Sequence, residues 1–312
     1  MINRELIRTK IVQLTYAYYQ NGNHNLDNAE KELLFSLDKA YDLYNYLLDL
    51  IVAITDVAHQ RYDIAMARYD RGEGGKPSHR FVNNRFAKQL KENTALNEWK
   101  EHQRQTWDDD ITTVRKILDS IEASVIYQEY LAATDFPTYE DDRDLWRRLY
   151  KTLIVNNEEL DALLEEKSLY WNDDKNVVDT FVIKTIKRFE EANGAGQELL
   201  PQYKDTEDRG FALKLFSNTI TNAEEYQHFM TTTSRNWDFS RLAYMDVVIM
   251  QIAIAEMVSF PAIPVSVTIN EYVDLAKEYS TPKSWRYING MLDAIARYLS
   301  ESGKMLKPVP ER

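Results

Sequence analysis

The sequence predicts an all-α protein. Its 312 residues include only 9 glycines and 8 prolines, which leaves long segments where apolar residues recur at helical spacing. Valine, isoleucine and threonine rarely alternate with polar residues, so the strand signal is weak throughout. In residues 247–258 only Gln251 and Glu256 interrupt an apolar run. A helix with so little polar surface must be surrounded by other helices.

Composition indicates a cytoplasmic protein that does not enter a membrane. There is no cysteine, which excludes disulfides and thiolate metal sites and suits a reducing compartment. The start of the chain lacks the apolar core of a signal peptide, and no run reaches the roughly 20 apolar residues of a membrane span. The net charge of −12 argues against binding nucleic acid by bulk charge, so any such contact requires a local basic patch.

The first predicted helix covers residues 3–20 and is locally basic. Arg4, Arg8 and Lys10 stand against a single acidic residue in this helix. Arg4 and Arg8 lie four residues apart on one face, and Tyr16 follows further along. Two interpretations remain open. The helix is either a solvated amphipathic helix or a basic strip that holds phosphates and stacks a base on an aromatic ring.

The middle of the chain, from about residue 25 to 200, is predicted to be helical with short breaks. The expected helices cover residues 28–71, 111–130, 143–167 and 177–192. The glycine-rich segment 72–78 invites comparison with a phosphate-binding loop. That motif requires glycine and serine or threonine at the positions that hold Arg71 and Pro77, so we predict an ordinary loop here.

A second basic segment follows that loop. Residues 76–91 contain five basic side chains, no acidic one, and two phenylalanines between them. The basic residues are Lys76, Arg80, Arg85, Lys88 and Lys91. This segment predicts either a second RNA-facing surface or a cluster that balances the acidic residues around 108–110.

The C-terminal third is predicted to form a helix over 208–230 and then a bundle of three helices. The last two carry apolar residues at helical spacing over 267–279 and 285–299, and Ser280-Thr281-Pro282 predicts a cap and a proline at the first helical position for the final one. Asn289-Gly290 is a turn signal in isolation, but its flanks have helical periodicity. Glycine inside a helix costs about 1 kcal/mol relative to alanine, so we expect another backbone to approach closely at Gly290.

No set of residues suited to catalysis is visible. Glu225 and His228 have the spacing of one half of a di-iron site, but the second Glu-x-x-His motif that such a site requires is absent. The remaining histidines lack metal-ligand spacing, and no nucleophile elbow or nucleotide fingerprint is present. We therefore predict a binding protein that is not an enzyme and that needs no metal and no cofactor.

The C-terminal third also carries an ordered set of motifs. They are Trp237-x-x-x-Arg241-Leu242 with Asp246, Ile252-Ala253 with Glu256 and Pro264, Val267-x-Ile269-Asn270-Glu271-x-Val273-x-Leu275-Ala276-Lys277, and Ser284-x-x-Tyr287-Ile288-Asn289-Gly290-x-Leu292-Asp293. This set resembles the NusB family of transcription antitermination factors. Arg8-x-x-x-x-Gln13-x-x-Tyr16 is similar to the first helix of that family. The chain departs from the family in having Gln251 where arginine is common, and in a less basic first helix.

The resemblance implies a NusB-like pair of helical bundles with a large helical insertion in the N-terminal bundle. The implied parts are an N-terminal subdomain over 1–235 (first family helix 3–20, insertion about 25–200, third family helix about 208–234), a C-terminal bundle over 236–305 and a tail over 306–312. The second family helix is not placed. Asn270 and Glu271 are expected to have structural roles.

The resemblance further implies an RNA-binding antitermination factor. Such a protein binds boxA-type RNA together with the ribosomal protein NusE, within the transcription elongation complex, and supports transcription of ribosomal RNA. The implied RNA-binding residues are Arg4, Arg8, Lys10, Gln13, Tyr16, Lys283, Ser284, Trp285, Arg286 and Tyr287. Arg8 and Tyr287 are then expected to share one face of the protein.

Alternative functions stay open at this point. The chain could be a helical adaptor that captures a protein through its insertion, or a NusB-like module of the machinery that processes and methylates ribosomal RNA. Some members of the family form homodimers, and the sequence does not decide the oligomeric state.

Overall fold

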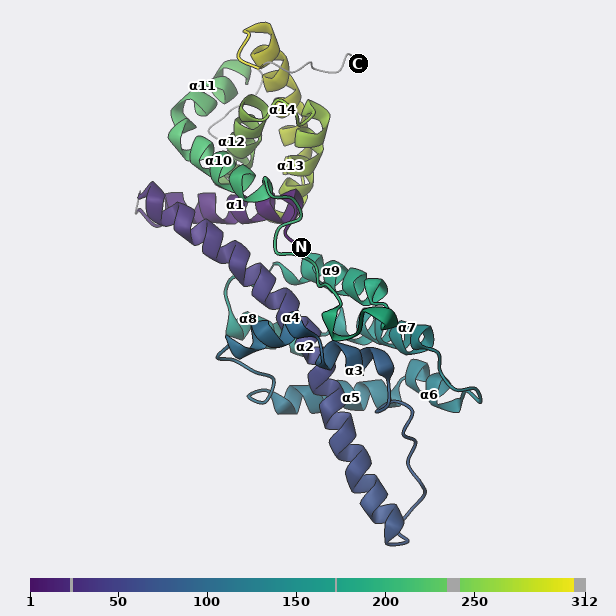
Figure 1. Cartoon of the computed structure of the whole chain (residues 1–312). Helices are drawn as coiled ribbons and strands as arrows, with labels where there is room; N and C mark the ends of the chain where they lie inside the picture. The colour runs from purple at the N-terminus through teal and green to yellow at the C-terminus, as the bar shows by residue number, and fades with distance from the viewer. Residues whose placement is uncertain (23–24, 172, 235–241, 306–312) are drawn as a thin grey trace. The chain divides into compact units, whose positions relative to one another are not determined.

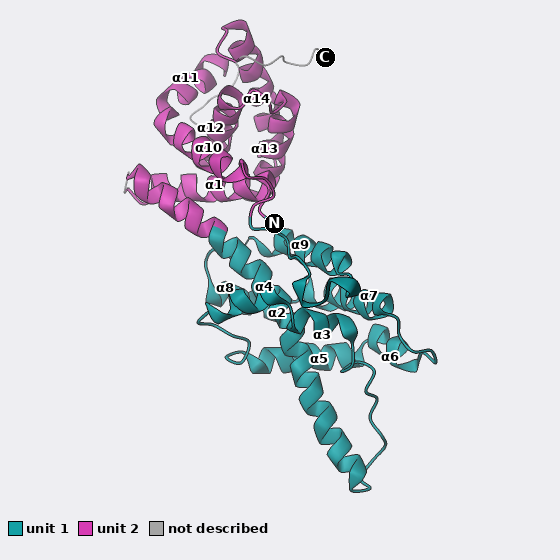
Figure 2. Cartoon of the chain, in the orientation of Figure 1, with its two compact units in different colours: residues 1, 38–202 teal, residues 2–37, 203–312 magenta. Residues whose placement is uncertain are grey.

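The computed structural model describes residues 1–22, 25–171, 173–234 and 242–305. Within these ranges the structure is helical and contains no β-strand, which confirms the predicted all-α class. Contacts divide the chain into two compact units (Figure 2). Unit 1 consists of Met1 and Asp38–Gln202, and unit 2 consists of Ile2–Leu37 and Tyr203–Arg312. None of the described helices is long and apolar enough to cross a membrane.

Unit 2 is a bundle built around one central helix (Figure 1). Its helices are α1 (Arg4–Gln20), the beginning of α2 (Leu26–Asp70), α10 (Asp208–Thr221), α11 (Ala223–Thr233), α12 (Tyr244–Ser259), α13 (Val265–Tyr279) and α14 (Ser284–Glu301). The apolar helix α12 contacts α1, α10, α11, α13 and α14. Every residue from Val248 to Met257 is buried, which confirms the prediction that this helix is surrounded.

Two predicted helix boundaries in unit 2 are wrong. The segment expected as one helix over 208–230, and as a family helix to about 234, forms α10 and α11, because Asn222 has a non-helical backbone (φ −106°, ψ 22°). Helix α14 begins at Ser284 without the cap expected from Ser280-Thr281-Pro282. The Ser280 hydroxyl instead donates to the buried carboxylate of Asp246.

The expected close approach at Gly290 is also wrong. Asn289 and Gly290 lie inside α14, as the helical flanks predicted. Gly290 is exposed, and a Cβ added there would meet no atom within 4 Å. Packing therefore gives no reason for glycine at this position.

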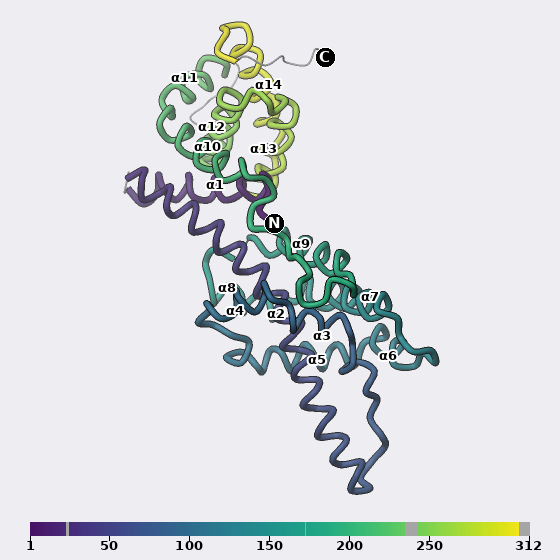
Figure 3. Tube along the Cα trace, viewed as in Figure 1, coloured from purple at the N-terminus to yellow at the C-terminus, as the bar shows by residue number. Residues whose placement is uncertain are grey.

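Unit 1 contains a set of shorter helices together with most of α2. Its other helices are α3 (Arg85–Lys91), α4 (Thr94–Glu101), α5 (Ile111–Ala123), α6 (Val125–Ala132), α7 (Tyr139–Leu149), the π-helix η1 (Tyr150–Ile154), α8 (Glu158–Lys167), α9 (Lys175–Arg188) and the 3-10 helix η2 (Glu191–Gly196). The trace of α2 is one uninterrupted helix of 45 residues, which confirms the long helix predicted over 28–71 (Figure 3). Helix α7 contacts α3, α6 and α9 and continues into η1.

Polar residues divide two segments that were predicted as single helices. The segment 111–130 is broken at Ser124, whose side chain accepts a hydrogen bond from the backbone of α6. The segment 143–167 is broken before α8, where Asn156 adopts a positive φ of 61° and Asn157 caps the new helix. Asparagine and serine favour such positions because their short side chains bond to nearby backbone groups.

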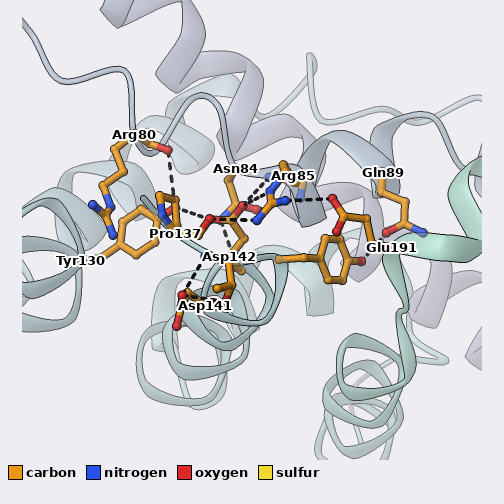
Figure 4. A network of polar contacts seen from close by, with 12 residues as sticks. Arg80, Asn84, Arg85, Gln89, Tyr130, Pro137, Asp141, Asp142 and Glu191 are labelled. Atoms are coloured by element: carbon orange, nitrogen blue, oxygen red, sulfur yellow. Dashed lines mark hydrogen bonds and ion pairs between the residues drawn. The ribbon is translucent and has the colours of Figure 1, made fainter. Parts of the chain in front are cut away.

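Arg80 and Arg85 of the basic segment 76–91 belong to a polar network (Figure 4). Arg85 pairs with Asp142, which is fully buried, and with Glu191. Arg80 donates to the backbone carbonyls of residues 133 and 135. Lys91 pairs with Asp56. The acidic partners are Asp142, Glu191 and Asp56, so the predicted balance with the residues around 108–110 is wrong.

Two predicted boundaries fall outside the residues that the structure describes. These are the division after residue 235, which lies next to the motif residues Trp237 and Arg241, and the tail over 306–312. Both stay predictions.

Candidate nucleic-acid interface

The second half of α1 lies against the end of α13 and the beginning of α12. The Gln13 amide donates to the Tyr279 hydroxyl at 3.1 Å. The Tyr16 ring makes an edge-to-face contact with Tyr244, with 5.7 Å between ring centroids. Tyr16 and Tyr244 are 37% and 43% exposed, so this aromatic pair has open ring surface. The arrangement brings Gln13 and Tyr16 to the end of the helix that leads into α14.

A buried carboxylate anchors the connection from α13 to α14. The hydroxyl groups of Ser280 and Ser284 both donate to Asp246, and the bond from Ser284 is 2.9 Å long. Asp246 is only 3% exposed. Thr281 and Ser284 also share a hydrogen bond of 2.6 Å. The first turn of α14 is therefore held against the first turn of α12.

Basic residues at the start of α14 face solvent. Lys283 and Arg286 are exposed, and no carboxylate of the described residues pairs with either. The Arg286 guanidinium lies 5.1 Å from the centroid of the half-buried Trp285 ring, and the Lys277 amine lies 5.5 Å from it. This part of the surface combines cations with an aromatic ring, a combination used to hold single-stranded nucleic acid.

Arg8, which was predicted to contact RNA, points into unit 2. Its guanidinium makes a two-pronged ion pair with Glu256 (Nε to Oε2 2.8 Å, Nη2 to Oε1 3.0 Å) and a third contact with Glu271 at 3.1 Å. Burial lowers the pKa of Arg8, whereas the hydrogen bonds and the negative charge of Glu256 raise it. The effects that raise the pKa outweigh that of burial, so the pKa of Arg8 lies above the ordinary arginine value. Glu256 also accepts bonds from Thr268 and Tyr272.

Three of the predicted contact residues are buried and present no surface to a ligand in this structure. Arg8 is 4% exposed, Lys10 is 2% exposed and Ser284 is 7% exposed. The face that Arg8 and Tyr287 were expected to share is therefore not formed by Arg8, because Glu256 and Glu271 hold it inside. The structural role expected for Glu271 agrees with its ion pair, whereas Asn270 is exposed.

Arg4 lies apart from the other predicted contacts. Its side chain is 40% exposed, is 3.4 Å from Asp208, and stands 5.0 Å from the centroid of the Phe211 ring. Gln13 is more than two turns further along α1, about 13 Å along the helix axis at about 1.5 Å per residue. The structure thus groups Gln13, Tyr16 and the start of α14 but leaves Arg4 at the far end of α1.

Sequence reasoning missed two tyrosines that complete this surface. Neither Tyr279 nor Tyr244 was among the predicted contact residues. An exposed tyrosine cannot be told from a core tyrosine by helical spacing alone. The separate signal was the series of tyrosines at positions 16, 18 and 19, which lies in the helix with Gln13.

Gln251, the departure from the family pattern, has a defined structural role. Its amide donates to the Tyr19 hydroxyl at 2.7 Å and to the carbonyl of Thr219 at 2.8 Å. It is 1% exposed. The glutamine therefore links the central helix α12 to α1 and α10 and does not reach the surface.

No metal centre is found among the residues that the structure describes. Glu225, considered above with His228 as half of a di-iron motif, pairs with Lys304 on the surface.

Comparisons with known proteins agree with this picture of unit 2. The model of the NusB family matches residues 176–297. A relative from Salinibacter ruber named transcription antitermination protein NusB is 32% identical over 132 residues, which is 40% of this chain and 82% of the relative. Proteins of the same name from Dictyoglomus turgidum and Chloroherpeton thalassium are 37% and 32% identical over 112 and 122 residues, with 78% and 58% of their lengths covered. No solved structure matches the chain.

The family match begins at residue 176, inside the range predicted as an insertion. The extent of the insertion therefore stays a prediction. The family consists of antitermination proteins that are not enzymes, in agreement with the predicted binding role. With four fifths of a NusB protein covered at 32% identity, the chain belongs to the NusB family.

Proposed function

We propose that this protein is a cytoplasmic antitermination factor that binds boxA-type RNA together with NusE in the transcription elongation complex. The observation that carries the proposal is the surface on unit 2 where Gln13 of α1 contacts the end of α13 and Tyr16 contacts the beginning of α12, next to the exposed start of α14. We call this the α1–α14 surface.

The chemistry of the α1–α14 surface suits single-stranded RNA. Lys283 and Arg286 supply cations for phosphates, since no described carboxylate neutralises them. Trp285 and Tyr16 offer aromatic surface, and each stacked base contributes about 1–3 kcal/mol. The amide of Gln13 can bond to a base edge.

The buried residues at this surface do not contact RNA themselves but hold in place the helices that carry the exposed contact residues. Asp246 and Ser284 hold the first turn of α14, and Arg8 holds α1 against α12 and α13. In this proposal they are positioning residues. The direct contacts are Gln13, Tyr16, Lys283, Trp285, Arg286 and the half-buried Tyr287.

The test is fluorescence anisotropy of a labelled boxA RNA, with a scrambled RNA as control, in the presence and absence of the cognate NusE. We expect boxA RNA to bind more tightly than the scrambled RNA and NusE to increase the affinity further. The double variant Lys283→Glu/Arg286→Glu should lose most of this binding. Arg297→Glu, which makes half of that charge change near the other end of α14, should retain it.

An affinity for boxA RNA that does not change on adding NusE would contradict the proposal. Equal effects of the Lys283/Arg286 and Arg297 variants would place the RNA elsewhere on the protein.

A further inference from the structure

Unit 1 contains a recess that its helical packing does not fill. It has a volume of about 350 Å³ and is lined by residues of α2, by α4 and the segment after it, and by the end of α8 with the segment that follows. Ligand pockets in proteins span about 300–1,000 Å³, so this recess is at the small end of the range. Its size suits one nucleotide-sized group.

Aromatic side chains form much of its wall and are fixed in place by hydrogen bonds. The Trp99 indole donates to Asp42 at 3.1 Å, and the Trp171 indole donates to the carbonyl of Lys39 at 2.8 Å. The Tyr46 ring stacks on Trp107 with 4.2 Å between centroids. Tyr46 and Trp171 are buried, whereas Trp99 is half-buried. Trp99 therefore offers the accessible aromatic surface of the recess.

The charge in the recess is opposite to that of the rest of unit 1. Residues 38–202 contain 22 basic and 32 acidic side chains, a net charge of −10. The recess is lined by three cations, Lys39, Arg104 and Lys167, and by a single carboxylate, that of Asp42. Asp110 lies outside the lining but pairs with Lys167. When its carboxylate is counted with that of Asp42, the three cations still exceed the carboxylates by one positive charge.

Arg104 is the cation best placed to meet a ligand. Lys39 donates to Asp42 at 2.8 Å, and Lys167 lies 2.5 Å from Asp110. Arg104 is exposed, and none of the described carboxylates pairs with it. A guanidinium matches the paired oxygens of a phosphate and binds them in two-pronged fashion.

Polar side chains on the same wall can form hydrogen bonds with the edge of a planar ligand. The amide of Gln103 and the hydroxyl of Ser168 line the recess near Trp99. Amides and hydroxyls both donate and accept hydrogen bonds, as the edges of nucleobases require. An aromatic platform, a free guanidinium and polar edge groups together select a planar, hydrogen-bonding anion.

We propose that this recess binds a nucleobase that carries a phosphate, either as a free nucleotide or as one nucleotide of a single-stranded RNA. The base stacks on Trp99, its edge meets Gln103 and Ser168, and the phosphate meets Arg104. This site belongs to unit 1 and does not depend on the function proposed for the α1–α14 surface.

The test uses the full chain with two probes of the same base, AMP and a labelled oligoadenylate. AMP binding is measured by isothermal titration calorimetry and oligoadenylate binding by anisotropy. Trp99→Leu keeps apolar bulk but removes the stacking surface, and Arg104→Glu reverses the phosphate contact. Arg115→Glu is the matched control, since Arg115 is also an exposed residue of unit 1 that pairs with no described carboxylate. Lys283→Glu/Arg286→Glu removes binding of the oligonucleotide at the α1–α14 surface.

We expect Trp99→Leu and Arg104→Glu each to weaken binding by about tenfold or more, the effect of losing one stacked base or one paired phosphate. Arg115→Glu should bind as the unaltered protein does. Loss of affinity for both probes would identify a nucleotide site, and loss for oligoadenylate alone would identify a site for RNA.

The proposal fails if neither variant changes the affinity for either probe when measured in the Lys283→Glu/Arg286→Glu background. Circular dichroism of each variant distinguishes loss of the site from loss of the fold. If Trp99→Leu does not fold, Arg104→Glu decides, because an exposed side chain can be changed without altering the core.

Discussion

Two groups of basic residues in unit 2 use the same chemistry for opposite purposes. In α1, Arg8 and Lys10 are 4% and 2% exposed, and Arg8 is held by Glu256 and Glu271. At the start of α14, Lys283 and Arg286 are exposed and have no described acidic partner. For Arg8 the difference is set by carboxylates on other helices, Glu256 of α12 and Glu271 of α13. A basic residue therefore belongs to a binding surface only where the fold leaves it without such a partner.

The largest expected effect is the loss of stability caused by Arg8→Ala. Removing the guanidinium leaves the carboxylate of Glu256 buried and without its main partner, which costs about 3–5 kcal/mol. Urea unfolding followed by circular dichroism measures this loss. The control is Arg297→Ala, whose exposed pair with Asp293 four residues earlier on α14 contributes under about 1 kcal/mol. Equal losses for the two variants would show that Arg8 is not the structural residue described here.

The next largest loss of stability is expected for Asp246→Ala. Asp246 is buried like Arg8, but it anchors the first turn of α14, which carries the exposed cations. Asp246→Ala leaves the hydroxyl groups of Ser280 and Ser284 without their acceptor, at a cost of about 1–3 kcal/mol. The same variant should weaken boxA binding, since the first turn of α14 loses its anchor. Glu225→Ala, an exposed carboxylate paired with Lys304, is the control for both measurements. RNA affinity that survives the loss of Asp246 would separate the anchor from the binding surface.

The double variant Lys283→Ala/Arg286→Ala, which removes the exposed cations, should weaken RNA binding and leave the stability of the fold almost unchanged. Surface substitutions of this kind change the free energy of unfolding by less than about 0.5 kcal/mol. Each phosphate contact removed should reduce the slope of log affinity against log salt by about 1. The measurement is boxA anisotropy over a series of salt concentrations. A slope equal to that of the unaltered protein would mean that these cations do not meet phosphates.

Local pattern was enough to predict much of the fold. Helices α2 and α12–α14 were expected because their apolar residues repeat at helical spacing over many turns. The breaks at Ser124 and Asn222 were missed because one polar residue interrupts such a pattern no more than any surface position does. The division into units could not be read from the sequence, since it depends on contacts between distant segments.

The candidate surface was predictable only in part, for the same reason. Basic residues at helical spacing predicted a cationic α1, but the partner that buries Arg8 lies 248 residues away in sequence. Family resemblance located the start of α14, and its exposed cations agree with a binding role. Tyr244 completes an aromatic pair with Tyr16 that no local pattern links, because the two residues meet only in the folded bundle.

Gly290→Ala is expected to have the smallest effect on stability, and its effect on boxA binding tests how far along α14 the RNA extends. It is exposed in the middle of α14, and a Cβ there meets no atom within 4 Å, so Gly290→Ala should stabilise the protein by about 0.5–1 kcal/mol through the loss of unfolded-state freedom. Gly290 lies three residues after Tyr287, on the helix that carries the exposed cations. If RNA passes closely over this part of α14, the same variant should weaken boxA binding while raising the midpoint of urea unfolding. Unchanged boxA binding would limit the RNA path to the first turn of α14, and a fall in stability would contradict the open space around Gly290.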